Sequence, residues 1–120
     1  MAWIFENDRP IYTQLLEQIE QKIIAGEYPA GSRLPSVREL AAEAAVNPNT
    51  MQRAMSELER KGLIITNRTA GRSVTEEEQI LKQLKGDKAL DYTKEYLKKM
   101  KELGYDRHEI GEWIKKGEKE

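Results

Sequence analysis

The feature that most constrains this chain is a two-residue link between two helical patterns. The first pattern opens on SVRE at 36–39, where Ser and Glu have capping-box spacing ahead of apolar residues at helical intervals. The second opens on Asn47–Pro48, a good N-cap followed by a good first helical residue, and predicts a helix over 48–61 that stops at Gly62. Only Ala45–Val46 separate the two, and a link of that length is a tight turn. The sequence therefore predicts a helix-turn-helix.

Segments on either side extend this unit. Apolar residues at helical spacing predict a further helix that opens at Pro10 and ends at Gly26. The stretch EYPAGSRLP, with its Pro and Gly breakers, is predicted to be a loop. After the second motif helix, a short strand at 63–65 and a return strand at 73–74 flank NRTAGR, which has the composition of a turn. This order predicts a winged helix-turn-helix domain over residues 1–74, mainly α with a small β-hairpin.

The predicted helix 48–61 presents two different faces. Its apolar residues, which share one face, are Met51, Ala54, Met55 and Leu58. The polar residues of the other face are Asn49, Gln52, Arg53 and Ser56. In a helix-turn-helix this second helix places its N-terminal residues in the major groove of DNA. Because Asn and Gln can pair with two atoms of adenine and Arg with two atoms of guanine, the polar face predicts sequence-specific reading of DNA.

Charge supports this interpretation only modestly. Residues 33–74 carry seven Lys or Arg and four Asp or Glu, a local charge of +3. Residues 75–120 carry eleven against twelve, a local charge of −1. A strong nucleic-acid binder often has a basic domain, so the local excess favours DNA without deciding the matter.

Other function classes lack the residues they need. The chain has no Cys and a single His, His108, which leaves thiol chemistry, His-pair metal sites and His–Ser catalysis without support. No apolar run approaches the roughly 20 residues that span a bilayer. The start, MAWIFENDRP, lacks the basic and apolar regions of a secretory signal. We therefore expect a cytoplasmic protein that is not an enzyme and has no cofactor, no metal and no membrane association.

Residues 10–74 resemble the N-terminal winged helix of GntR-type bacterial transcription regulators. The resemblance is carried by GSRLPSVRELA, Asn49–Thr50, Arg53–Ala54 and LERKGLI, which match in order. The VNPNT form and the short helical C-terminal tail are similar to the YtrA-type subgroup. Other members of the superfamily carry ligand-binding domains that a chain of this length cannot contain.

The resemblance implies which residues contact double-stranded DNA. In and beside the two motif helices these are Ser36, Arg38, Asn47, Asn49, Thr50, Gln52 and Arg53. The tip of the wing, with Arg68, Gly71 and Arg72, is implied to enter the minor groove.

Three positions depart from the family pattern. Ala45 stands where a turn Gly is usual, so this residue is expected to accept a left-handed conformation at some cost in free energy. Pro48 replaces a frequently basic residue, which removes one phosphate contact. The wing reads RTAGR in place of the commoner RGxG form.

Residues 75–120 are predicted to be a helical dimerisation tail. Thr75 is expected to cap a long helix with a kink or short break near Gly86–Asp87. Asp106 and Glu109 form a second capping box, which opens a short last helix. The apolar stripe of the tail must be covered, and a second copy of the chain is a better partner than the winged domain, whose apolar residues serve its own core. The expected dimer interface comprises Tyr92, Tyr96, Met100, Leu103 and Trp113.

The residues and the resemblance together favour a homodimeric, sequence-specific DNA-binding transcription regulator that acts as a repressor at an inverted-repeat operator. The alternative is a winged-helix module that binds protein or RNA without an operator. Gln52, Arg53 and the basic wing favour DNA over that alternative. An enzyme is the weakest option, because no nucleophile–base set is visible. The tail is too small to enclose an obvious ligand pocket, so any small-molecule effector is expected to act at the subunit interface.

Overall fold

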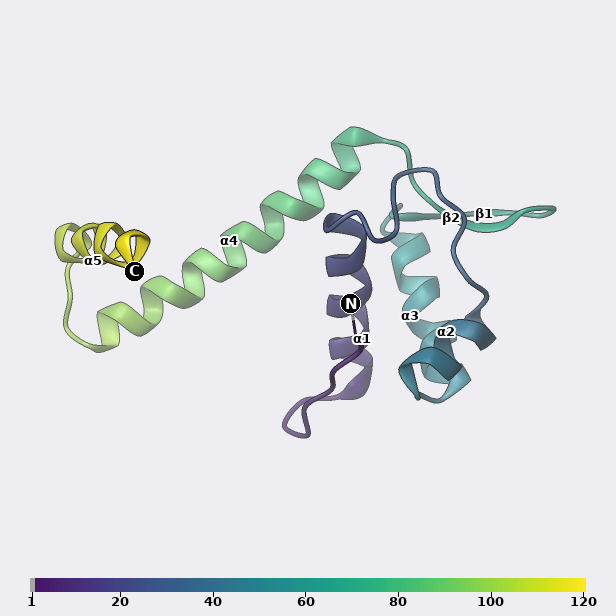
Figure 1. Cartoon of the computed structure of the whole chain (residues 1–120), viewed down its shortest axis with the longest axis horizontal. Helices are drawn as coiled ribbons and strands as arrows, with labels where there is room; N and C mark the ends of the chain where they lie inside the picture. The colour runs from purple at the N-terminus through teal and green to yellow at the C-terminus, as the bar shows by residue number, and fades with distance from the viewer. Residues whose placement is uncertain (1) are drawn as a thin grey trace. The chain divides into compact units, whose positions relative to one another are not determined.

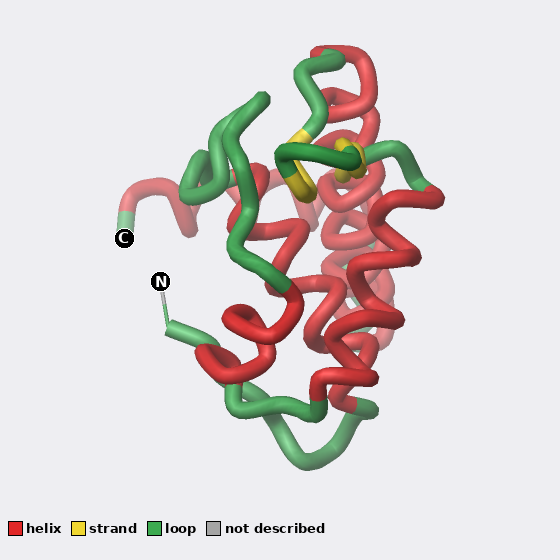
Figure 2. Tube along the Cα trace, turned by 90° about the vertical axis from the view of Figure 1, so that its right-hand side faces the viewer, coloured by secondary structure: helices red, strands yellow, loops and turns green. Residues whose placement is uncertain are grey.

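The computed structural model describes residues 2–120 and is mainly α-helical with one small hairpin (Figures 1 and 2). The elements in chain order are α1 (Ile11–Ile24), α2 (Val37–Ala44), α3 (Pro48–Arg60), β1 (Ile64–Asn67), β2 (Gly71–Val74), α4 (Glu78–Glu102) and α5 (Arg107–Lys119). The predicted fold class, a winged helix-turn-helix followed by helices, is confirmed. None of the helices within the described residues has the length and apolar content needed to cross a bilayer.

The chain divides into two compact units inside α4, after Leu84. The first unit therefore extends beyond the boundary at residue 74 that the sequence suggested. The reason is that three apolar side chains at the start of α4, Ile80, Leu81 and Leu84, pack against the core of the winged unit. The second unit comprises residues 85–120.

The core of the first unit lies between α1, α2, α3 and the hairpin. Burial of an apolar side chain contributes about 1.5–3 kcal/mol, so this cluster provides most of the unit's stability. Its largest fully buried apolar members are Leu15, Ile19, Leu40, Met51, Met55, Leu58, Ile64 and Val74. The apolar face predicted for helix 48–61 is fully buried here, which leaves the polar face of α3 free to meet a ligand.

The caps and the turn of the helix-turn-helix form as predicted. Ser36 and Glu39 make a reciprocal capping box, with both hydrogen bonds at 3.1 Å. The side chain of Asn47 caps α3 by accepting a hydrogen bond from the backbone N–H of Asn49 at 2.7 Å. Ala45 adopts the left-handed conformation, with φ 56° and ψ 46°. This backbone conformation turns the chain from α2 into α3, and a residue with a Cβ adopts it at a cost in free energy.

The wing is larger than predicted. β1 and β2 pair in antiparallel register from Ile64 opposite Val74 to Asn67 opposite Gly71, so only Arg68 to Ala70 remain in the turn. The side-chain oxygen of Asn67 holds that turn closed by accepting the backbone N–H groups of Thr69 and Ala70. Such side-chain bonds stabilise tight turns locally and let the strands extend further toward the tip.

The segment predicted to be a loop ahead of α2 partly pairs with the wing. Its residues 31–34 lie antiparallel to β2 through three backbone hydrogen bonds: Gly31 N–H to Val74 O at 2.9 Å, Val74 N–H to Ser32 O at 2.9 Å, and Leu34 N–H to Arg72 O at 2.8 Å. This long-range pairing ties the start of α2 to the wing.

Three expectations about helix starts and breaks are wrong. Pro10 is the N-cap of α1, one residue before the helix, rather than its first residue. The break near Gly86–Asp87 is absent, because α4 runs as one helix through both positions. A single interior Gly lowers helix stability by only about 1 kcal/mol, too little to end a helix of this length. Thr75 does not cap α4, because it lies three residues before the first helical residue and its hydroxyl accepts the backbone N–H of Glu77, which precedes the helix, at 3.1 Å.

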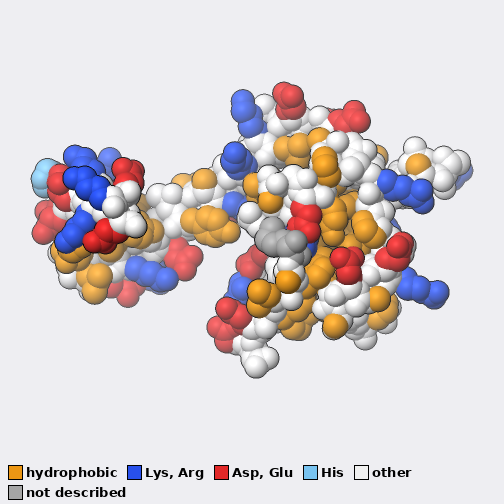
Figure 3. Space-filling view, in the orientation of Figure 1, with side chains coloured by type: hydrophobic (Ala, Val, Ile, Leu, Met, Phe, Trp, Pro, Cys, Tyr) orange, Lys and Arg blue, Asp and Glu red, His pale blue; other side chains and the backbone are white. Residues whose placement is uncertain are grey.

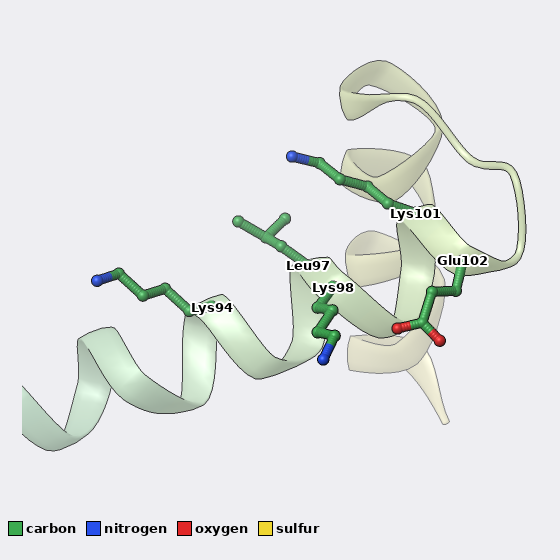
Figure 4. Close-up of a pocket in the computed structure, with 5 residues that line it drawn as sticks. All are labelled: Lys94, Leu97, Lys98, Lys101 and Glu102. Atoms are coloured by element: carbon green, nitrogen blue, oxygen red, sulfur yellow. The ribbon is translucent and has the colours of Figure 1, made fainter.

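The second unit is a pair of helices, the later part of α4 and α5, joined by a short turn. Asp106 and Glu109 form the predicted capping box at the start of α5. Ile110 is the buried residue of α5, and the rings of Tyr105 and Trp113 lie with centroids 5.8 Å apart. Along α4, Lys94, Leu97 and Lys101 project in similar directions, so aliphatic lysine stems flank the one apolar side chain (Figure 4).

Candidate nucleic-acid interface

A concavity of about 740 Å³ in the first unit brings together the start of α2, one position of α3 and the wing. Its polar and charged lining residues are Arg33, Ser36, Arg38, Glu39, Gln52, Thr66 and Arg72, and Gly71 completes the wing side. Three arginines against one glutamate give the lining a net positive charge. A basic, polar and concave surface suits the sugar–phosphate backbone of a nucleic acid.

The start of α2 contributes a fixed helix N-terminus and one free cation. Ser36 uses its hydroxyl in the capping box, where Glu39 accepts the backbone N–H of Ser36. The hydrogen bond from the backbone N–H of Ser36 is the main reason why the pKa of Glu39 is lowered, and the nearby positive charge of Arg33 lowers it further. Arg38 is exposed and forms no ion pair with any other described residue. Its guanidinium is therefore available to an anion.

In α3, consecutive polar residues lie in different surroundings. Gln52 lines the concavity, and its amide donates to the hydroxyl of Ser56 at 3.2 Å. Arg53 is outside the lining: its guanidinium stacks on the ring of Tyr12 in α1, with Cζ 4.4 Å from the ring centroid. Successive side chains of a helix project about 100° apart, which explains the separation. Gln52 is the side chain of α3 that the structure places beside α2 and the wing.

The wing is attached to α3 by an ion pair. Nε of Arg72 donates to the carboxylate of Glu59 at 2.5 Å. Burial alone would raise the pKa of Glu59, but hydrogen bonds from Arg72 and Thr66 outweigh it and the pKa is lowered. Arg68, in the turn, is exposed. The two wing arginines therefore differ, one held against α3 and one at the tip.

The structure gathers half of the DNA-contact residues implied by the sequence. The predicted residues that line the concavity are Ser36, Arg38, Gln52, Gly71 and Arg72. Those that lie outside its lining are Asn47, Asn49, Thr50, Arg53 and Arg68. Asn47 and Asn49 are exposed at the start of α3 and Thr50 is half-buried there.

The residues predicted from the sequence do not include Arg33, because its segment is predicted to be a loop. They also do not include Tyr12 and Glu59, which contact Arg53 and Arg72. The sequence does place Arg33 within GSRLPSVRELA and beside the capping box, but neither its motif position nor its positive charge assigns it a DNA contact.

In the second unit, four of the five residues predicted for a dimer interface are exposed. Leu103 is 72% exposed and Tyr92 61%, while Tyr96 and Trp113 are less so. Met100 is half-buried. Hydrophobic side chains reach the surface of this unit among groups of both charge signs (Figure 3). A monomer leaves these large apolar side chains in water.

Comparison with known proteins agrees with the geometry of the first unit. The pattern of the bacterial regulatory proteins of the gntR family matches residues 11–74. The chain belongs to this family. GntR-family proteins are transcription regulators with a DNA-binding helix-turn-helix and are not enzymes, in line with the prediction from sequence.

Two relatives from Bacillus subtilis extend the similarity beyond the winged unit. The HTH-type transcriptional regulator YhcF is 40% identical over 111 residues, which cover 92% of each chain. The HTH-type transcriptional repressor YtrA is 36% identical over 113 residues, covering 91% of this chain and 85% of that protein. The helical tail of this GntR-family chain is therefore shared with them.

Solved structures show the same relationship. A GntR family transcriptional regulator from Listeria monocytogenes has a TM-score of 0.87 and 41% identity, covering 93% of this chain and 98% of that one. The DNA-binding domain of AraR, in complex with the operator ORX1, has a TM-score of 0.55 and 25% identity, covering 60% of this chain and 93% of that one. The second structure contains DNA, so it is a precedent for DNA binding by a domain that resembles the winged unit.

Proposed function

We propose that this GntR-family chain is a homodimeric repressor that binds an inverted-repeat operator in double-stranded DNA. The observation that carries the proposal is the basic concavity in which Gln52 of α3, the N-terminus of α2 and the wing face one space. In a winged helix-turn-helix these three parts contact, in the same order, the major groove, the phosphate backbone and the minor groove of DNA. The repressor role is supported by the name of the relative YtrA, and operator binding by the AraR complex.

Within the concavity, the proposed roles follow from side-chain chemistry. Gln52 reads a base edge, because its amide can donate to and accept from adenine. Arg38 holds a phosphate with its unpaired guanidinium. The N-terminus of α2 attracts the same anion through its helix dipole, with the Ser36 hydroxyl beside it.

Residues outside the concavity are proposed to extend the contact along DNA. Asn47, Asn49 and Thr50 lie at the start of α3, the end that enters the major groove in this motif. Arg53 projects toward α1, so we assign it to a flanking phosphate rather than to a base edge. At the wing, Arg68 at the tip enters the minor groove and the Gly71–Arg72 strand start supports it.

The tail is proposed to join two subunits. Exposed large apolar side chains need a cover, and a second copy of the same unit offers an identical surface, as a two-fold interface requires. The proposed interface residues are Tyr92, Tyr96, Met100, Leu103 and Trp113. Two linked subunits would cover half-sites about one helical turn, ~34 Å, apart. We place this protein in the cytoplasm, without a membrane partner or cofactor, and any effector at the subunit interface.

Binding to DNA and RNA duplexes of the same sequence tests the ligand class. The full chain is titrated against each labelled duplex at matched salt. We expect the DNA duplex to bind more tightly, with affinity falling as salt rises, because A-form RNA has a deep, narrow major groove that side chains cannot read. Equal or tighter binding of RNA would indicate an RNA-binding module, and no binding to either duplex would indicate a protein-interaction module.

A further inference from the structure

The backbone of Arg33 is held in register with the wing. Arg33 forms an antiparallel bridge with Ser73, between the hydrogen bonds that join residues 31–34 to β2. Leu34 is buried in the core, and in extended backbone neighbouring side chains alternate between faces. The side chain of Arg33 is accordingly directed away from the core, and it is exposed.

The guanidinium of Arg33 lies over the first residue of β2. Its Nε and Nη2 are 3.7 and 3.8 Å from the position that a Cβ on Gly71 would occupy. Gly71 has no side chain and adopts φ +79°, so the arginine sits close to the wing backbone. It therefore lines the same concavity as Arg38 and Gln52, on the wing side.

The charge of Arg33 is not matched by an ion pair. Among the described residues, Glu39 lies near enough for its charge to interact with that of Arg33, but its carboxylate accepts the backbone N–H of Ser36, and Glu59 pairs with Arg72. No ion pair within 4 Å includes Arg33 itself. A guanidinium held by its backbone, exposed and unpaired, has five N–H donors to offer.

We propose that Arg33 is a phosphate-binding residue of the DNA site, which clamps the backbone strand between the wing and the start of α2. This inference rests on the proposed function and adds a contact that the sequence motifs do not indicate. A guanidinium can bind a phosphate with two parallel hydrogen bonds, and Arg33 and Arg38 line the two sides of the same space. The contact is independent of sequence, so it contributes to affinity for any duplex.

The test compares Arg33→Gln with Arg38→Gln and Arg60→Gln in the full chain. Arg60 is the matched control, because it is ion-paired with Glu57 at the far end of α3. A labelled random-sequence DNA duplex is titrated by fluorescence anisotropy over a series of KCl concentrations. We expect Arg33→Gln to weaken binding several-fold. The negative slope of log K against log[salt] should become less steep by about 0.9, the value for one phosphate. Arg60→Gln should match the wild type.

Arg33→Lys separates a phosphate contact from a structural role. Lysine keeps the charge, so the salt slope should return to that of the wild type even if affinity recovers only in part. Wild-type affinity and slope for Arg33→Gln, beside a clear loss for Arg38→Gln, would overturn the assignment of Arg33 and leave the proposed function standing. A salt slope for Arg33→Lys as shallow as that for Arg33→Gln would also overturn the assignment of Arg33 to a phosphate. A wild-type chain that does not bind the duplex would overturn the proposed function itself.

Discussion

The guanidinium of Arg53 stacks on the ring of Tyr12, whereas its neighbour Gln52 lines the basic concavity. The stack joins α3 to α1 across the surface of the winged unit. A cation–π contact at an exposed site contributes about 0.5–1 kcal/mol, enough to favour one arrangement of a long side chain. The two residues were equivalent on the polar face predicted from the sequence, and the structure separates them.

This separation predicts different effects on DNA binding. Gln52→Ala should weaken binding to the operator by about 1–3 kcal/mol and leave binding to random DNA nearly unchanged, because it removes a base contact. Arg53→Ala should reduce affinity for both DNAs by similar factors, because a phosphate contact carries no sequence information. Competition titrations with operator and random duplexes measure the ratio. A larger loss of specificity for Arg53→Ala than for Gln52→Ala would contradict the assignment.

The wing gives a second prediction, which concerns the flanks of the operator. A narrow minor groove concentrates negative potential, most strongly in A-tracts, and attracts arginine. Arg68 is the exposed arginine of the tip, so Arg68→Ala should lower affinity mainly for operators with A·T-rich flanks. Arg60→Ala, with the same loss of charge on α3, is the control. If flank composition has no influence on binding by the wild type or by Arg68→Ala, the wing makes only phosphate contacts.

The left-handed turn residue gives a prediction about stability. Ala45 has φ 56°, a conformation that Gly adopts without the penalty of a Cβ. Ala45→Gly should therefore raise the free energy of unfolding, by about 1 kcal/mol. The same change at Ala42, exposed inside α2, should lower it by about 1 kcal/mol. Urea denaturation of both variants measures the two values, and a loss of stability for Ala45→Gly would mean that the turn rearranges.

The tail gives a prediction about assembly. Leu103→Asp and Trp113→Asp should convert a dimer to a monomer at micromolar concentration, because each places a charge in an apolar contact. Leu103 is 72% exposed within its subunit, so its replacement should leave the subunit folded. Lys119→Asp, near the end of α5, is the control. Sedimentation velocity distinguishes the species. A wild-type monomer under these conditions would rule out the tail-mediated dimer and favour a role for the tail in binding another protein.

A truncation test of the same interface should cut after Leu84. Ile80, Leu81 and Leu84 cover the core of the winged unit, so a cut after residue 74 would expose it. The shorter chain should be monomeric. Its affinity for a single half-site should be lower than the affinity of the full chain for an operator with two half-sites, because linking two contacts raises the overall affinity.

Local signals explain why so much of the winged unit was predictable. The capping box at Ser36, the N-cap at Asn47 and the left-handed Ala45 each depend on residues within a few positions. Long-range contacts explain the rest. The pairing of residues 31–34 with β2, the stack of Arg53 on Tyr12 and the ion pair of Arg72 with Glu59 join segments whose proximity no local pattern encodes. The extra length of the wing depended on Asn67 bonding into its own turn.

The tail was harder to predict because its helices carry few long-range constraints. Gly86 and Asp87 are unfavourable in a helix and suggested a break, but favourable residues on both sides carry α4 through them. The packing of α5 on α4 determines which apolar side chains of the tail are exposed. This packing buries Ile110 and leaves Leu103 in water.

Selection of bound duplexes from a random DNA pool by the full chain tests the central claim most directly. A dimer whose subunits each insert α3 into the major groove should enrich an inverted repeat with half-site centres about one helical turn, ~34 Å, apart. Repeating the selection with Gln52→Ala should relax the sequence at one position of each half-site and keep the spacing. A single unrepeated motif, or no enrichment at all, would contradict the account of this protein as a dimeric operator-binding regulator.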